Sequence, residues 1–328
     1  MTIARRKELA AMEKLTLEEV RRYSEELRTW NRWGEDDEIG TLNFVTPERI
    51  VEAAKLITKG ETFALAINFD ANGPQTGGLG RFNPVHTMLA TGVDAAHGVQ
   101  DEMNVQYADD ILSLPLHGAT HWDSLSHVFY DSYMWNGYSA ELVSAYGAEK
   151  NGIEKAKEKM VGRGVLLDIA RHKGAEALDE GYAITSDDLD NCASHQNVEV
   201  RSGDFVLVRT GQLGKCLRSE SWGDYAGGDA PGLAFETLNW IHSHEIAAVA
   251  SDTWGVEVRP NETNEEEAYQ PWHWVAIPNM GLSVGEIFYL EELAEACSDD
   301  SRYEFFFVAP PLPITGASGS AVNPIAIK

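Results

Sequence analysis

The feature that most constrains the fold is a series of short apolar runs separated by stretches of helical periodicity. Each run has the length and composition of a buried strand. The runs are "GVLLDIA" (164–170), "DFVLVRTG" (204–211), "IAAVASDT" (246–253) and "EFFFVAPPLPI" (304–314). Helical patterns lie between them, around 186–194, 233–243 and 284–296. This alternation predicts a mixed α/β domain, and no internal repeat or linker divides the chain.

The N-terminal part of the sequence has its own helical pattern over residues 5–32. Thr16, followed three residues later by Glu19, is typical of a capping box. Thr46 and Pro47 indicate the start of another helix, with proline in its first turn. We therefore expect an N-terminal helical extension (1–32) and one following domain (33–328).

Residues 70–82, "DANGPQTGGLGRF", are rich in glycine but match neither common phosphate-binding pattern. We expect a loop there and no nucleotide site.

The charge balance excludes several partners. The chain of 328 residues carries 52 acidic and 26 basic side chains, for a formal net charge of −26. Such a surface repels nucleic acid and anionic membranes, and no apolar run is long enough to span a bilayer. With three isolated cysteines and no signal-peptide pattern, we expect a cytoplasmic protein. An acidic substrate would need a local positive centre, such as a metal ion.

The stretch "LHGATHWDSLSHV" (116–128) holds three of the ten histidines and an aspartate. Imidazole and carboxylate groups bind zinc, manganese or iron. His117, His121 and Asp123 would leave coordination positions open, as catalytic metal sites do. His127, four residues beyond the aspartate, could act as general base or acid. The alternative is a chance cluster of histidines in the core or on the surface.

These residues occupy odd positions and would share one face of a strand. An extended chain from His117 to Asp123 would cover about 20 Å, so the chain must bend to bring both to one ion. Gly118 and Ala119 are small enough to permit a bend.

The motif resembles the signature of the metal-dependent cyclase family, which includes bacterial kynurenine formamidase and isatin hydrolase. That signature runs His-x-Gly-Thr-His-x-Asp-x-Pro-x-His. The chain departs from it at Ala119, where the family has glycine, and at Leu125, where it has proline. Segments such as "GRGVLLDIAR", "SGDFVLVRTG" and "MGLSVGEIFYLEELA" extend the resemblance over nearly the whole chain from about Trp33.

The resemblance implies a swivelling β/β/α domain in a homodimer or homotetramer, with manganese or zinc as the divalent cofactor. It also implies that His117, His121 and Asp123 bind the catalytic metal and that His127 is the catalytic acid or base. In members with two zinc ions, His273 and Glu286 would hold the second ion. The sequence leaves open whether one metal or two are bound.

Aromatic residues surround these candidates and suggest a small-molecule substrate that is aromatic or cyclic. Trp122 and Trp272 would line its pocket, although ordinary core packing explains such residues as well. The expected activity is hydrolysis of a C–N bond in a cyclic amide, imide or aryl formamide by metal-activated water. The alternatives are a lactone or ester hydrolase of the same family and a metal-binding relative without activity.

Overall fold

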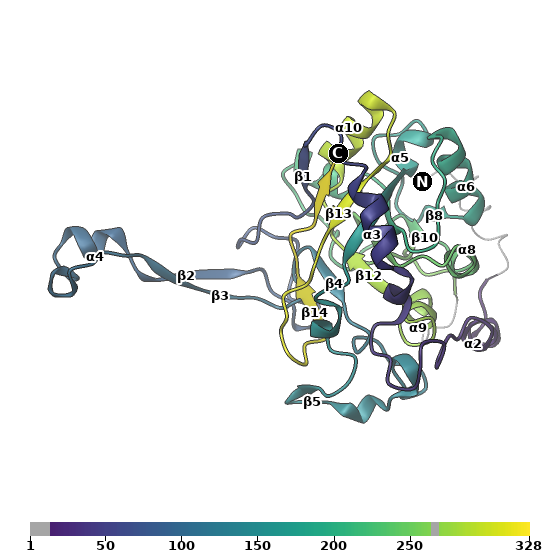
Figure 1. Ribbon diagram of the computed structural model, residues 1–328, viewed down its shortest axis with the longest axis horizontal. Helices are drawn as coiled ribbons and strands as arrows, with labels where there is room; N and C mark the ends of the chain where they lie inside the picture. The colour runs from purple at the N-terminus through teal and green to yellow at the C-terminus, as the bar shows by residue number, and fades with distance from the viewer. Residues whose placement is uncertain (1–13, 264–268) are drawn as a thin grey trace.

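A mixed sheet of nine strands forms the centre of the molecule within residues 14–263 and 269–328, the part of the chain that this computed structural model describes (Figure 1). The four middle strands are parallel, and every other neighbouring pair is antiparallel. In spatial order the strands are β1 (Thr62–Ala64), β15 (Ile325–Ile327), β13 (Glu304–Val308), β7 (Val161–Asp168), β9 (Phe205–Arg209), β11 (Ala248–Ser251), β12 (Ser283–Glu286), β4 (His121–Asp123) and β14 (Gly319–Ala321).

Helices cover both faces of this sheet (Figure 1). The helices of the described residues are α2 (Leu17–Glu26), α3 (Pro47–Ala54), α4 (Gly92–Ala96), α5 (Ile169–His172), α6 (Ser186–His195), α7 (Gln212–Arg218), α8 (Thr237–Ser243), α9 (Pro271–Ala276) and α10 (Glu291–Asp300). Of these, α4 lies away from the sheet (Figure 1). Short 3-10 turns lie at Gly40–Phe44, Gly78–Gly80, Asp101–Met103, Trp135–Gly137, Ala140–Leu142 and Ile153–Ala156. None of the helices in the described ranges is long and apolar enough to cross a membrane.

The middle strands are mostly apolar because both faces of the sheet are buried. On β9, Val206 and Val208 join one core cluster, which α6, α8 and α9 cover. Phe205 and Leu207 on the same strand join a second cluster on the other face, under α10. The four apolar runs in the sequence each contain one strand of the sheet, so the expectation of a mixed α/β domain is confirmed. The finer assignment to the swivelling β/β/α type stays a prediction.

The caps expected at the N-terminal helices are present. Thr16 and Glu19 form a capping box at the start of α2, and the Thr46 side chain caps α3. Val20 of α2 is buried in the main core cluster, so this helix packs on the domain. Residues 5–13 of the expected first helix lie outside the described residues.

One expectation from the sequence is wrong. The helix expected over 284–296 starts only at Glu291, because residues 283–286 pair with β11 and β4 as strand β12. Before the metal motif, residues 111–113 belong to strand β3 (Asp109–Ser113), which pairs with β2 (Val85–Ala90).

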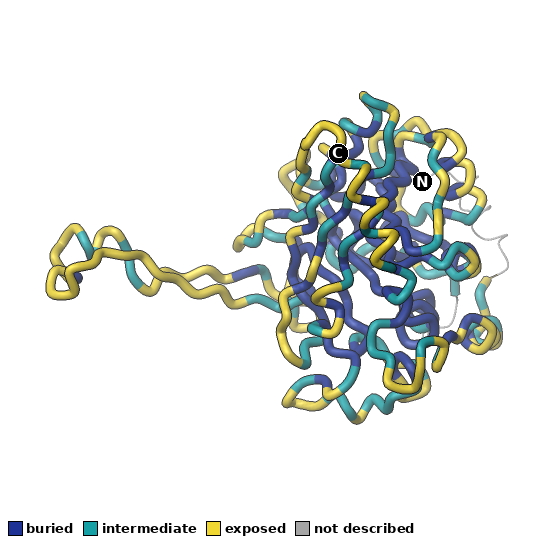
Figure 2. Tube along the Cα trace, viewed as in Figure 1, coloured by how far each residue is buried: buried dark blue, intermediate teal, exposed yellow. Residues whose placement is uncertain are grey.

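Strands β2 and β3, with α4 between them, form an arm that projects from the body (Figure 1). Most residues of the arm are exposed to solvent (Figure 2). Two further pairs of short strands lie on the body: β5 (Val143–Ser144) with β6 (Gly147–Ala148), and β8 (Ala183–Ile184) with β10 (Gly232–Leu233).

Candidate metal centre

Strand β4 places two residues of the motif on one face of the sheet. In the antiparallel register His121 lies opposite Glu286 of β12, and Asp123 lies opposite Gly319 of β14. His121 Nε2 is 3.4 Å from Asp123 Oδ1 and 3.3 Å from Glu286 Oε2. All three side chains are buried, so the sheet itself assembles the core of the cluster.

The chain bends before β4, as the distance argument requires, and Gly118 N–H donates to Pro115 O at 2.9 Å within the bend. The bend brings His117 Nε2 to 3.4 Å from Asp123 Oδ1. A Cβ atom on Gly319 would lie 2.3 Å from His117 Nε2, so only glycine leaves room for this imidazole.

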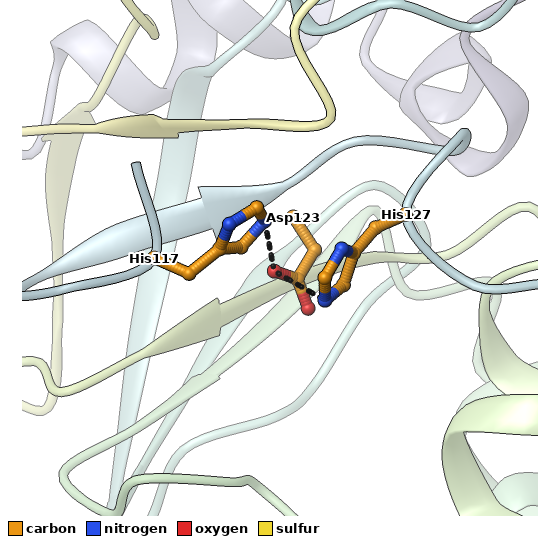
Figure 3. Close-up of side chains that lie close together, drawn as sticks. All are labelled: His117, Asp123 and His127. Atoms are coloured by element: carbon orange, nitrogen blue, oxygen red, sulfur yellow. Dashed lines mark ion pairs between the residues drawn. The ribbon is translucent and has the colours of Figure 1, made fainter. Parts of the chain in front are cut away.

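His127 approaches the same aspartate after β4. Its Nε2 lies 3.9 Å from Asp123 Oδ1, and its ring stacks on that of His117 with 4.1 Å between the centroids (Figure 3). The side chain of His127 is 25% exposed, whereas that of His121 is fully buried. His127 is therefore the imidazole of the motif that solvent or a substrate can reach most easily.

Helix α9 supplies His273, whose Nε2 lies 3.3 Å from Glu286 Oε1. The other ring nitrogen, Nδ1, is 2.5 Å from Glu257 Oε1. Glu257 also accepts the backbone N–H groups of Trp272 and His273, which fixes the start of α9. Sequence reasoning missed Glu257, because nothing in the sequence distinguishes it from the other acidic residues.

The geometry of the cluster fits a cation. Two sets of side chains, His117–Asp123–His127 and Asp123–His273–Glu286, each bring ligand atoms within 4.8 Å of one another and share Asp123. His121 Nδ1 lies 2.7 Å from Ala119 O and donates to it, so Nε2 is the ring nitrogen that faces the cluster. His121 Nε2 and Asp123 Oδ1 are buried without a hydrogen-bond partner among the described residues. Buried polar atoms of this kind normally have a partner, and imidazole with carboxylate is a common ligand set for zinc and manganese.

The electrostatics of the cluster also fit a bound cation. Burial alone would lower the pKa of His121, but the carboxylates of Asp123 and Glu286 outweigh burial and raise it to about 9. Burial likewise opposes the shift at His273, where Glu257 and Glu286 raise the pKa to about 10. These buried carboxylates thus require a nearby positive charge, which imidazolium groups or a bound cation can supply.

The pKa values of His117 and His127 are lowered, whereas those of His121 and His273 are raised. Burial lowers the pKa of His127, although the charge of Asp123 partly opposes this. Burial also holds the pKa of His117 well below its ordinary value, and the neighbouring His127 lowers it further. Both rings are therefore neutral near pH 7 and can accept a proton or bind a metal.

The structure brings six of the candidate residues from the sequence together: His117, His121, Asp123, His127, His273 and Glu286. Glu286 lies on strand β12 and not at an exposed helix N-terminus, the alternative that its sequence context allowed.

The two tryptophans lie elsewhere. Trp122 is fully buried and points to the opposite face of the sheet from His121. Its ring packs on Phe288, and its Nε1 donates to Ala309 O. Trp272 is fully buried in the first core cluster and its Nε1 donates to Thr237 Oγ1. These placements correct the expectation that both rings line a substrate pocket.

The fold and the cluster together define a mixed α/β protein with a candidate metal centre. The Cyclase family model, described as "Putative cyclase", matches residues 42–258. The chain therefore belongs to this cyclase family.

Solved structures agree with the family assignment. A crystal structure described as a novel cyclase is 41% identical and has a TM-score of 0.83, covering 92% of this chain and 100% of its own. Isatin hydrolase A from Labrenzia aggregata is 16% identical with a TM-score of 0.59, covering 85% of this chain and 97% of its own. A predicted metal-dependent hydrolase from Bacillus stearothermophilus is 16% identical with a TM-score of 0.53, covering 82% and 98%. The last two show a shared fold only. None of the curated proteins matches the chain.

Proposed function

We propose that this protein is a hydrolase that uses manganese or zinc to cleave the C–N bond of a cyclic amide, an imide or an aryl formamide. One observation carries the proposal: two ligand sets meet at Asp123, whose buried Oδ1 has no hydrogen-bond partner among the described residues. The likeness of the fold to an isatin hydrolase supports the same class of reaction.

The residues divide into two groups. His117 and His121, which both approach Asp123, would hold one divalent ion with it. His273 and Glu286 would hold a second ion together with Asp123. A divalent ion at this position would polarise a carbonyl group and lower the pKa of a water molecule.

His127 is the residue that would move the proton. Burial holds its pKa below the ordinary value, so the ring is neutral at pH 7 and can accept a proton from water at Nε2. The same nitrogen would then give the proton to the departing nitrogen of the substrate. Its partial exposure fits this role better than the fully buried His121 would.

Two alternatives remain from the sequence. A lactone or ester hydrolase would use the same residues and differ only in the leaving atom. An inactive relative would explain the departures at Ala119 and Leu125, but both residues are buried in apolar clusters. These departures therefore change core packing and remove none of the imidazole or carboxylate groups.

The test is turnover of a panel of cyclic amides, aryl formamides and lactones, with and without added manganese or zinc. We expect metal-dependent hydrolysis of an amide, its loss in Asp123→Asn, and its retention in the exposed control Glu52→Gln of α3. Hydrolysis of lactones alone would favour the first alternative. A metal-loaded protein without any turnover would favour the second.

We also propose that the protein forms a homo-oligomer through the arm. Of the twenty-one large hydrophobic side chains exposed among the described residues, twelve lie between residues 79 and 112. An isolated two-stranded hairpin is at best marginally stable in water. Exposed apolar surface of this extent marks an interface.

A second copy of the chain is the partner that fits best, because most soluble oligomers are closed and symmetric. Exchange of two arms would bury on the order of 800 Å² per partner, the area of a standard interface. Light scattering after gel filtration should show a dimer or tetramer that Leu89→Asp combined with Ile111→Asp dissociates. A monomeric wild-type protein at micromolar concentration would contradict this assembly.

A further inference from the structure

Arg81 lies beside the metal motif, at the end of the glycine-rich loop that the proposed function does not use. The carbonyl oxygen of Phe82, the next residue, would be 3.2 Å from a Cβ atom on Gly118. The backbone around Arg81 is therefore packed against the residue that follows His117.

The guanidinium group of Arg81 is held over an aromatic ring. Its Cζ lies 5.2 Å from the centre of the Trp254 ring, within the range of a cation–π interaction. Trp254 Nε1 is 3.4 Å from Gln75 Oε1, and Gln75 Nε2 donates to Gly118 O at 2.9 Å. This chain of contacts ties the position of Arg81 to the same bend.

Arg81 has no carboxylate partner within residues 14–263 and 269–328. Among the described residues no ion pair and no side-chain hydrogen bond involves its guanidinium group, which is half-buried. A chain with 52 acidic side chains could readily have supplied one. The planar guanidinium group is well suited to bidentate binding of a carboxylate.

The neighbouring arginine on the same ring differs in this respect. Arg259 lies 5.8 Å from the centre of Trp254, but it donates to Gly227 O, Gly228 O and the Tyr269 hydroxyl. The donors of Arg259 are occupied within the protein, whereas those of Arg81 have no partner in the described part of the chain and can bind a ligand.

The loop that carries Arg81 contacts the motif at Gly118, the residue after His117. Phe82 O packs against Gly118, and Gln75 Nε2 donates to its carbonyl oxygen. A ligand anion at Arg81 would therefore lie beside the histidine motif.

We propose that Arg81 binds a carboxylate group of the substrate, so that the enzyme selects amides or formamides that carry a negative charge. This inference rests on the proposed hydrolase function. It also identifies a positive centre, formed by the chain itself, that could attract an acidic substrate to a protein with a net charge of −26. A fork of guanidinium donors matches the two oxygens of a carboxylate, and each charged hydrogen bond is stronger than a neutral one.

The first experiment measures binding and does not require turnover. Calorimetric titration of the metal-loaded protein with benzoate and with its neutral analogue benzamide would compare wild type, Arg81→Gln and the control Arg22→Gln. Arg22 lies on α2, where it forms an exposed pair with Glu26 and a cation–π contact with Tyr23. We expect Arg81→Gln to raise the Kd of benzoate about tenfold, with benzamide and the control unchanged. Equal benzoate affinity in Arg81→Gln and wild type, or no benzoate binding at millimolar concentration, would overturn the proposal.

The second experiment measures selectivity with a matched pair of aryl formamides, 2-formamidobenzoate and formanilide. We expect Arg81→Gln to raise KM for the carboxylated substrate while kcat and the KM of formanilide stay the same, and Arg81→Lys to recover part of the loss. An equal effect on both substrates would overturn the assignment. If neither compound is hydrolysed but benzoate binding depends on Arg81, the hydrolase proposal fails and the anion site stands.

Discussion

His121 and Glu286 face each other across two antiparallel strands, with Nε2 of the imidazole 3.3 Å from Oε2 of the carboxylate. Both side chains are buried. The register of β4 and β12 therefore joins the histidine motif to a glutamate that lies far along the chain. This pairing makes Glu286 part of one cluster with Asp123.

Removing the charge of Glu286 should weaken metal binding. Glu286→Gln keeps the size of the side chain but loses one anionic ligand of the Asp123–His273–Glu286 set. We expect the affinity for zinc or manganese to fall at least tenfold in a calorimetric titration. The control is Glu292→Gln, an exposed residue of α10. Equal affinities in both variants would contradict the role of Glu286.

Glu257 should act through His273. Its Oε1 lies 2.5 Å from His273 Nδ1 and so orients the ring, leaving Nε2 free toward Glu286. Partners of this kind typically contribute 10- to 100-fold to metal affinity. We expect Glu257→Gln to reduce the affinity by roughly that factor, measured by competition with a chelator. An unchanged affinity would mean that the start of α9 positions His273 without Glu257.

His127→Ala should separate the two roles that the geometry allows for this residue. If His127 transfers a proton, kcat should fall by about 10²- to 10⁴-fold while metal content stays the same. If His127 instead binds metal with His117 and Asp123, metal content should fall together with activity. Plasma mass spectrometry alongside steady-state kinetics distinguishes these results.

The pH dependence of the rate follows from the same residue. A general base must be unprotonated, and burial lowers the pKa of His127 below 6.5. The acid limb of the kcat/KM profile should therefore have its midpoint below pH 6.5, and the rate should fall as the pH drops through it. A midpoint clearly above 6.5 would be inconsistent with His127 as the base in this environment.

The core position of Trp122 predicts an effect on stability and none on substrate binding. Trp122→Phe removes part of a fully buried ring and its hydrogen bond to Ala309 O. We expect a loss of about 2 kcal/mol in the free energy of unfolding, measured with denaturant, and an unchanged KM. A raised KM with unchanged stability would return Trp122 to the substrate pocket.

Lys328 and Asp300 form a buried ion pair that should control stability at low pH. The Lys328 side chain is fully buried, and its Nζ lies 2.6 Å from Asp300 Oδ1. Burial opposes the shift, but Lys328 and Lys59 lower the pKa of Asp300 to about 2 from an ordinary value of 3.8. The stabilisation is present above pH 3.8 and is lost as the pH falls through about 2. Asp300→Asn should cost about 3 kcal/mol at neutral pH, whereas Glu52→Gln, in an exposed pair, should cost little.

The sequence predicted the central strands well because both faces of them are buried. Runs such as residues 205–208 consist only of apolar residues, mostly β-branched or aromatic, and lack the spacing of an amphipathic helix. The prediction from the sequence failed at residues 283–286, where the strand is only four residues long and helix α10 follows closely. There the pairing with β11 and β4 decides the structure, and pairing is not visible in one sequence.

The candidate site was predictable where its residues are local. The four polar residues of the motif lie within eleven positions of one another, and their chemistry alone suggests a metal. The period of two along a strand already separates Trp122 from His121 and Asp123, since neighbouring side chains point to opposite faces. Glu257 and Arg81 were missed because only the folded chain brings them to the motif.

The most direct test of the account counts metal ions per chain in purified wild-type protein and in Asp123→Asn by plasma mass spectrometry. Asp123 belongs to both ligand sets. We therefore predict one or two equivalents of manganese or zinc in the wild type and a loss of all of them in the variant. A wild-type protein without metal after reconstitution, or an Asp123→Asn variant that holds as much metal as the wild type, would contradict a metal centre at this cluster.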